Sequence, residues 1–190
     1  MSEPHRFGQS DLVSDTADDH VTTRLGEVAV ERASPGDAPA ILQLRDALAT
    51  WMVQHGISQW RPGEMPLAWI EVCIAQGWVF AASRDGNLVA SVTLVWTDPL
   101  VWGNQSDPAG YIHMLMVDRA HAGLGLGRSL LDWAERRIAR SGRHRARLDC
   151  VRANEPLRRY YENTGYAFVG YREFDERIPS TALYEKTLIA

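Results

Sequence analysis

Three glycines, at positions 123, 125 and 127, alternate with leucines in a segment whose backbone could bind a phosphate group. Residues 111–117, just before it, are apolar as in a buried strand, and apolar residues after it recur at helical spacing. The glycines therefore lie where a strand leads into a helix N-terminus. Glycine has no Cβ, so its backbone can approach a ligand closely, and the unpaired N–H groups of a first helical turn attract an anion.

The order of the glycines separates two kinds of phosphate site. A dinucleotide-binding turn reads G-x-G-x-x-G in the first strand–helix unit of its domain, whereas this segment reads G-x-G-x-G and follows several apolar segments. Asp149 lies about 20 residues further on, where a ribose-binding acid would be expected, so a nicotinamide-dependent enzyme remains an alternative. A Walker loop is excluded because no Gly-Lys-Ser/Thr follows.

The glycine segment resembles the pyrophosphate loop of the GNAT superfamily of N-acetyltransferases, which reads Q/R-x-x-G-x-G/A after a strand ending in valine. Here the strand ends at Val117, and Ala122 stands at the family's Arg or Gln position, which leaves its backbone N–H available but removes a side chain that helps fix the loop. The resemblance implies acetyl-coenzyme A as cosubstrate and no metal. The residues expected to bind it are Leu115, Met116, Val117, Ala122, Gly123, Leu124, Gly125, Leu126, Gly127, Arg128, Asn154 and Tyr161.

A second block, residues 154–166, is similar to the family's N-x-x-A-x-x-φ-Y-x-x-x-G-F signature, where φ is apolar. The same residues also predict a helix with Asn154 as its N-cap and Gly165 after its end. The resemblance implies that Asn154 contacts the pantetheine arm and that Tyr161 lies near the thioester sulfur. Tyr161 would act as the general acid, since a phenol is neutral at pH 7 with a pKa near 10. Tyr160 faces a different direction on the helix and is expected to be a packing residue.

An amine that attacks a thioester must first be neutral, so the reaction needs a base. His113 is the best candidate, because its unperturbed pKa lies near 6.5 and an apolar strand environment would keep the ring neutral. The alternative is a hydrogen-bonded core histidine. Asp149, Glu64 and Glu71 are weaker candidates, and a chain of water molecules could also carry the proton.

The oxyanion of the reaction also needs donors. The resemblance implies that backbone N–H groups of Leu115 or Met116 serve, freed from ladder pairing by a bulge in their strand.

The acceptor is expected to bind beside the segment 55–63 between the first two helices, where the family usually builds its acceptor wall. A cationic amine could rest against tryptophan rings, with a carboxylate as countercharge. A small primary amine is the first expectation, a protein or peptide acceptor is the second, and a catalytically silent coenzyme A binding module is the alternative outside enzymes. The rings and carboxylates considered are Trp51, Trp60, Trp69, Trp96, Trp102, Glu64, Glu71 and Asp107.

Composition excludes several classes of protein. A net charge of -4 and a pI near 5.9 argue against a nucleic-acid partner. No apolar run reaches the roughly 20 residues of a membrane helix, and the N-terminus lacks a signal-peptide core, so we expect a cytoplasmic monomer or homodimer whose partner is a small-molecule amine. Cys73 and Cys150 are expected to be buried free thiols in a reducing compartment. Basic residues between 136 and 147 form either a solvated helix face or a site for coenzyme phosphates.

We expect one domain, residues 27–190, after a mobile polar leader, residues 1–26. The expected fold is mixed α/β, a GNAT-like central mixed and mostly antiparallel sheet flanked by helices, and the resemblance covers about residues 28–188. Cap, turn and periodicity signals predict strands at 28–32, 78–83, 88–96, 111–117, 145–151, 167–174 and 182–188, and helices after 34–37 up to Gly56, at 66–76, after the glycine loop and at 154–164.

Overall fold

The computed structural model describes residues 20–174 and 179–188. Its strands are β1 (His20–Thr23), β2 (Gly26–Arg32), β3 (Val79–Arg84), β4 (Asn87–Val95), β5 (Gly110–Val117), β6 (Arg145–Val151), β7 (Ala167–Arg172) and β8 (Thr181–Thr187). Its α-helices are α1 (Ala38–Gln54), α2 (Leu67–Ala75), α3 (Pro99–Trp102), α4 (Leu126–Arg140) and α5 (Glu155–Asn163), and short 3-10 turns occupy Pro35–Asp37 and Arg119–His121.

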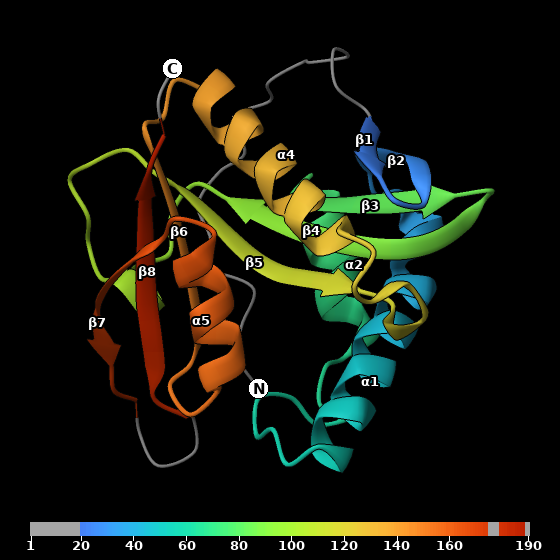
Figure 1. Ribbon diagram of the computed structural model, residues 1–190, viewed down its shortest axis with the longest axis horizontal. Coiled ribbons are helices and arrows are strands. Elements are labelled where there is room, and N and C mark those ends of the chain that lie inside the picture. Colours follow the sequence, from blue (N-terminus) through green and yellow to red (C-terminus); the bar gives the residue numbers. More distant parts are fainter. Residues whose placement is uncertain (1–19, 175–178, 189–190) are drawn as a thin grey trace.

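All eight strands form one sheet in the order β1-β2-β3-β4-β5-β6-β8-β7 (Figure 1). Neighbouring strands are antiparallel except β5 and β6, which run parallel in the middle of the sheet. The expected mixed, mostly antiparallel sheet with flanking helices is confirmed. Parallel neighbours need a crossover, and α4 supplies it between β5 and β6.

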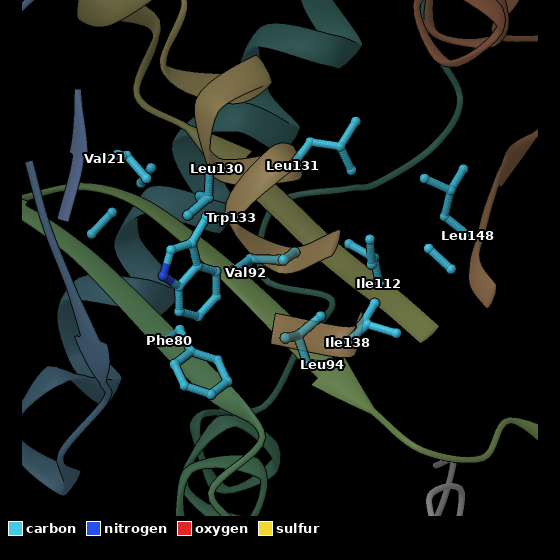
Figure 2. Close-up of a cluster of buried hydrophobic side chains, with 14 of the residues drawn as sticks. Val21, Phe80, Val92, Leu94, Ile112, Leu130, Leu131, Trp133, Ile138 and Leu148 are labelled. Carbon is cyan, nitrogen blue, oxygen red and sulfur yellow. The ribbon is translucent and has the colours of Figure 1, made fainter. Parts of the chain in front are cut away.

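The two faces of the sheet carry separate hydrophobic cores. One core joins β1–β6 and β8 to the apolar side of α4 and to Tyr161 of α5, and Figure 2 shows Leu130, Leu131 and Trp133 of α4 against strand residues such as Val92. The other core joins α1 and α2 to the opposite face. Helices therefore cover both faces of β5, the strand that carries His113.

Close packing of α4 on the sheet depends on a glycine at the start of β5. A Cβ at Gly110 would collide with the side chain of Ile138, which is fully buried. On the same helix, Trp133 meets the ring of Phe80 edge-on, with 4.9 Å between centroids. These contacts fix α4, and hence the loop at its N-terminus, relative to β5.

Three features differ from the sequence expectations. Strand β1 lies inside the segment assigned to the polar leader, because Val21 is buried in the core under α4, so that assignment is wrong for residues 20–26; residues 1–19 lie outside the described part. The expected loop between β4 and β5 contains the short helix α3. Strand β7 ends at Arg172 instead of Phe174.

Both cysteines are buried free thiols, as expected. Burial raises the pKa of the Cys73 thiol, and of the Cys150 thiol, to about 12. Within the described residues, no helix combines the length and the apolar character that crossing a bilayer requires.

Candidate active site

The strand β5 carries a bulge next to His113. In the ladder with β4, Ser91 pairs with Met116 and Thr93 pairs with His113, so two residues of β5 stand opposite the one residue Val92. Met114 takes the bulge conformation, with φ of 46°. The bulge that the resemblance implied is therefore present, and it turns the backbone away from regular pairing at the expected oxyanion donors.

Beyond the bulge, β5 and β6 separate. Their parallel ladder joins residues 110–112 of β5 to residues 146–148 of β6, whereas β5 continues to Val117 and β6 to Val151 (Figure 1). Figure 1 shows the two strands diverging, with α5 in front of β6 and the start of α4 at the end of β5. The polar backbone edges at this opening are available to a bound ligand.

The glycine loop lies at the end of β5, as predicted. Gly123 and Gly125 have φ of 78° and 87°, in the left-handed region, and a Cβ on either would meet nothing within 4 Å. Gly125 is the N-cap residue of α4. The loop thus presents open space beside a helix N-terminus, which fits a pyrophosphate group.

Two flanking residues of the expected coenzyme-binding set have partners within the protein. The backbone N–H of Ala122 donates to Arg119 O at 3.2 Å, so the expectation that this N–H stays available is wrong. The Arg128 guanidinium forms an ion pair with Asp132 one turn along α4, with Nε and Oδ1 2.9 Å apart. The loop gains support from elsewhere, because Arg24 N in the β1–β2 turn donates to Leu124 O.

His113 lies between two carboxylates. Its Nε2 is 3.3 Å from Asp98 Oδ2, and its Nδ1 is 3.6 Å from Asp149 Oδ1. The side chain of Asp98 is fully buried, whereas those of His113 and Asp149 are 17% and 21% exposed. The expected apolar surroundings of His113 are therefore wrong, and both nearby charges stabilise an imidazolium.

Asp98 was not singled out from the sequence. Its Oδ1 accepts a hydrogen bond from Val101 N at 3.2 Å and caps α3, whose first residue is Pro99. The Asp-Pro pair is a recognisable cap signal. Nothing local indicates that the second carboxylate oxygen would reach a histidine on the next strand.

Tyr161 of α5 lies on the opposite side of the sheet from α1, in the core that α4 also joins. Its ring contacts those of Tyr160, Tyr166 and Tyr184. Burial raises the pKa of the Tyr161 phenol well above its ordinary value, and electrostatic interactions with Cys150 and Asp149 act in the same direction. The phenol therefore stays protonated and can donate a hydrogen bond close to Asp149.

Tyr160 packs against the same core, as its helix position predicted. Its hydroxyl is buried and has no hydrogen-bond partner among the described residues. The two adjacent tyrosines therefore have different surroundings. Asp149 of β6 raises the pKa of the Tyr161 phenol, whereas for the Tyr160 phenol Arg128 of α4 lowers the pKa and Asp132 raises it.

The loop between α1 and α2 reaches across to α5. Asn154 Nδ2 donates to Gln59 Oε1 at 2.9 Å, while Asn154 Oδ1 accepts from Leu157 N as the cap of α5. Arg45, 2% exposed, anchors the same loop through Arg61 O. The segment expected to form the acceptor wall is thus held at Gln59 and at Arg61.

Most of the aromatic and acidic residues expected to bind the amine make contacts within the protein itself. The rings of Trp51, Trp60, Trp96 and Trp102 each face an arginine of the protein itself, at 4.0–5.5 Å from guanidinium carbon to ring centroid. Glu64 pairs with Arg45 and Asp107 with Arg145, while Glu71 is exposed on α2 and Trp69 packs in the second core. The expected amine-binding role of these residues is therefore not supported.

The basic stretch also has internal partners. Arg145 and Arg147 both pair with Glu185 of β8, and Arg147 also donates to Tyr111 Oη at 2.9 Å. Arg137 lies over the rings of Phe80 and Trp133. These residues form neither a purely solvated face nor an open phosphate site.

Asp98, His113 and Asp149 are also residue types that bind metals, and their ligand atoms lie within 4.8 Å of one another. A metal ion would bind one nitrogen of the imidazole. The nearest ring nitrogen is Nε2 for Asp98 and Nδ1 for Asp149. The cluster is therefore compatible with a bound ion as well as with proton transfer through the ring.

Comparison with known proteins agrees with this geometry. The family model described as "Acetyltransferase (GNAT) family" matches residues 43–166. An uncharacterized N-acetyltransferase, YesJ of Bacillus subtilis, is 35% identical over 156 residues, which cover 75% of this chain and 86% of the relative.

Solved structures show the same fold. A GNAT-family acetyltransferase from Listeria monocytogenes is 28% identical, with a TM-score of 0.75 over 89% of this chain and 99% of the other. A putative acetyltransferase from Salmonella typhimurium, solved with its cofactor acetyl-CoA, is 19% identical, with a TM-score of 0.60 over 86% and 95% of the two chains. The chain belongs to the GNAT family of acetyltransferases and is an acyltransferase.

Proposed function

We propose that the protein transfers the acetyl group of acetyl-coenzyme A to the primary amine of a small molecule, by direct attack of the amine on the thioester. The observation that carries the proposal is the position of His113, between two carboxylates and beside the point where β5 and β6 separate. The Salmonella relative's acetyl-CoA complex supports the same cosubstrate here.

The residues present fit coenzyme A. Gly123 and Gly125 leave room for the pyrophosphate at the N-terminus of α4, and the separated edges of β5 and β6 leave backbone groups for the pantetheine amides. Asn154, at the start of α5, would contact the same arm. When bound, the thioester supplies an electrophilic carbonyl carbon and a thiolate leaving group.

His113 prepares the nucleophile. A primary amine is an ammonium ion at neutral pH, and its nitrogen becomes nucleophilic only after one proton has been removed. The imidazole accepts this proton, and the carboxylates of Asp98 and Asp149 stabilise the resulting imidazolium. Solvent then receives the proton from the partly exposed ring.

Backbone and phenol groups stabilise the charges that develop next. The N–H groups of Leu115 or Met116, at the bulge, donate to the carbonyl oxygen as the C–N bond forms. As the C–S bond breaks, sulfur takes the electron pair and the proton of Tyr161. A second proton leaves the amine nitrogen and restores the phenol, so the products are the amide, the free thiol and one proton released to solvent.

The raised pKa of Tyr161 refines this role. A thiol has an ordinary pKa near 8.5, so complete transfer from a weakly acidic buried phenol to a thiolate is uphill. Tyr161 therefore helps chiefly by donating a hydrogen bond to sulfur as negative charge appears, and proton transfer is completed when the nitrogen proton is released.

The segment expected as the acceptor wall, residues 55–63, supports a small-molecule amine. It is bonded to the cap of α5 through Gln59 and to α1 through Arg45, so its position relative to these helices is fixed. An extended peptide would need an open groove at this place.

Release of free thiol from acetyl-coenzyme A tests the proposal. The enzyme is assayed with a panel of polyamines, amino acids, aminoglycosides and lysine-containing peptides, and the acetylated product is identified by mass. We expect thiol release to depend on a small amine and to yield an N-acetyl product. Thermal stabilisation by coenzyme A without turnover of any amine would favour the silent binding module, and turnover confined to peptides would overturn the small-molecule assignment.

A further inference from the structure

The buried carboxylate of Asp98 has no evident structural need to face a histidine. Its Oδ1 already caps α3 through Val101 N, yet its Oδ2 is also buried and makes no hydrogen bond of good geometry among the described residues. A buried carboxylate oxygen without a donor is costly, and the close polar neighbour is His113 Nε2 at 3.3 Å. At this distance the contact lacks alignment and not proximity, and catalytic hydrogen bonds are often poorly aligned before substrate binds.

We propose that Asp98 is a positioning residue, which holds the proton of neutral His113 on Nε2 and so leaves Nδ1 as the atom that accepts the proton of the acceptor amine. This inference rests on the proposed function for its catalytic consequence, but the tautomer itself is a property of the protein alone.

The surroundings of the imidazole ring determine which nitrogen carries the proton and which nitrogen accepts one. Asp98, on the Nε2 side, is fully buried and fixed by the cap of α3, so no substrate can reach that nitrogen from there. Nδ1 faces Asp149, which is 21% exposed on β6, at the opening between β5 and β6. Asp149 also acts electrostatically on Tyr161, so the Nδ1 side is the side of the expected thioester.

The burial of Asp98 supports the assignment of the proton to Nε2 of His113. A carboxylate is only an acceptor, so the group facing it must present a proton. If Nε2 carried no proton, two acceptors would face each other in a site sealed from water. The second carboxylate, Asp149, lies 3.6 Å from Nδ1, 0.3 Å further than Asp98 lies from Nε2, and it is partly exposed, so water can donate to it and it does not need a proton from the ring.

Asp98→Asn tests the inference with little change of shape. The amide oxygen can still accept from Val101 N, which turns the amide NH₂ toward Nε2. A donor at that position favours the opposite tautomer, with the proton on Nδ1, and removes the base at the reacting side. We expect kcat to fall about 10²-fold or more, with KM for acetyl-coenzyme A within about 2-fold, because a wrong tautomer removes the base and not the binding site.

Asp37→Asn is the matched control. Asp37 Oδ2 accepts from Ser34 N at 2.7 Å in the turn before α1, so this variant also converts a capping aspartate to asparagine. We expect turnover like that of the wild type. Equal losses of turnover in the two variants would mean that a weakened cap, and not the tautomer, causes the defect.

Nitrogen-15 NMR of the imidazoles measures the tautomer without any substrate. His113 is assigned among the six histidines by the signal that disappears in His113→Gln. We expect a protonated Nε2 in the neutral ring of the wild type and a protonated Nδ1 in Asp98→Asn. A protonated Nδ1 in the wild type would overturn the inference whether or not the enzyme acetylates an amine, and a reversed tautomer with unchanged kcat would overturn its catalytic consequence.

Discussion

Asn154 donates its side-chain amide to Oε1 of Gln59 at 2.9 Å, which joins the cap of α5 to the loop between α1 and α2. The family resemblance assigns the same amide to the pantetheine arm of coenzyme A. The amide carries two N–H donors, so one can stay on Gln59 while the other donates to the pantetheine arm, and Gln59 then orients Asn154 for the coenzyme.

Gln59→Ala should therefore weaken binding of acetyl-coenzyme A by about 2- to 10-fold, the value of one ordinary hydrogen bond. Isothermal titration measures the affinity, and Gln59→Glu is the control because it keeps an acceptor oxygen. Unchanged or tighter binding by Gln59→Ala would show that Asn154 does not depend on Gln59 for its position.

The glycine loop gives a second prediction. Acetyl-coenzyme A should raise the melting temperature of the wild type, whereas NAD should not, because a ligand that binds only the folded state stabilises it. Gly125→Ala should abolish most of this shift, since its Cβ projects into the open space beside the loop. Equal shifts with NAD and acetyl-coenzyme A would contradict the assignment of the loop.

Gly142→Ala controls for backbone strain in that experiment. Gly142 follows α4 at φ of 78°, and a Cβ there also meets nothing within 4 Å. Both variants place alanine in the left-handed region, which costs about 1 kcal/mol or more. Only Gly125→Ala should lose the response to acetyl-coenzyme A, while both should melt at a lower temperature than the wild type.

The parts of the site that depend on local sequence were predicted well. The glycine loop before α4 and the capped helix α5 with Tyr161 are continuous motifs, and each has its own propensity signals. The positions of His113 and Tyr161 on their elements followed from those motifs. Their catalytic roles stay predictions.

The partners of His113 could not be predicted because they come from other elements. Asp98 reaches it only after β4 has paired with β5, and Asp149 only after β6 has paired with β5. The same holds for Trp51 and Arg119, whose contact, 4.0 Å from guanidinium carbon to ring centroid, joins α1 to the segment after β5. Sequence patterns report which face of an element is buried, but not which side chain another element brings to it.

Removal of the base should lower turnover strongly without abolishing it. His113→Ala is expected to lower turnover by about 10- to 1000-fold, the usual range for a general base, because the loop and the oxyanion donors remain. The pH profile of kcat/KM should also lose its acidic limb. A variant that keeps the wild-type profile would make His113 a core residue.

The buried thiols predict a loss of stability at high pH. The folded chain holds the pKa of Cys73 at about 12 through burial, above the ordinary 9.0, so at alkaline pH the unfolded chain loses this proton first. The stabilisation is therefore complete below about pH 9 and is lost as the pH rises toward 12. Urea unfolding should show a free energy that falls as the pH rises from about 9 toward 12.

Cys73→Ala isolates this contribution, since it removes one titrating group from α2 at a distance from His113. Its free energy of unfolding should fall less steeply over the same pH interval. An identical pH dependence in the variant and the wild type would show that other groups, such as the buried tyrosines, account for the whole effect.

Tyr161→Phe removes one oxygen from a ring whose packing against Tyr166 and Tyr184 should survive. The melting temperature and the affinity for acetyl-coenzyme A should change little. If the phenol stabilises the leaving sulfur, turnover should fall by about 10²- to 10⁴-fold, the range for positioned proton transfer. The deficit should shrink with a coenzyme analogue whose thiol is more acidic, because a better leaving group needs less help.

Tyr160→Phe is the matched control, because it removes the hydroxyl of the adjacent tyrosine, which is buried and makes no hydrogen bond among the described residues. Its turnover should stay close to that of the wild type with both donors. Steady-state rates with one amine and both acyl donors, at a confirmed chemical rate limit, separate the possibilities. Wild-type turnover in Tyr161→Phe, or the same deficit with both donors, would remove the phenol from the chemical step and leave Tyr161 as a core residue of α5.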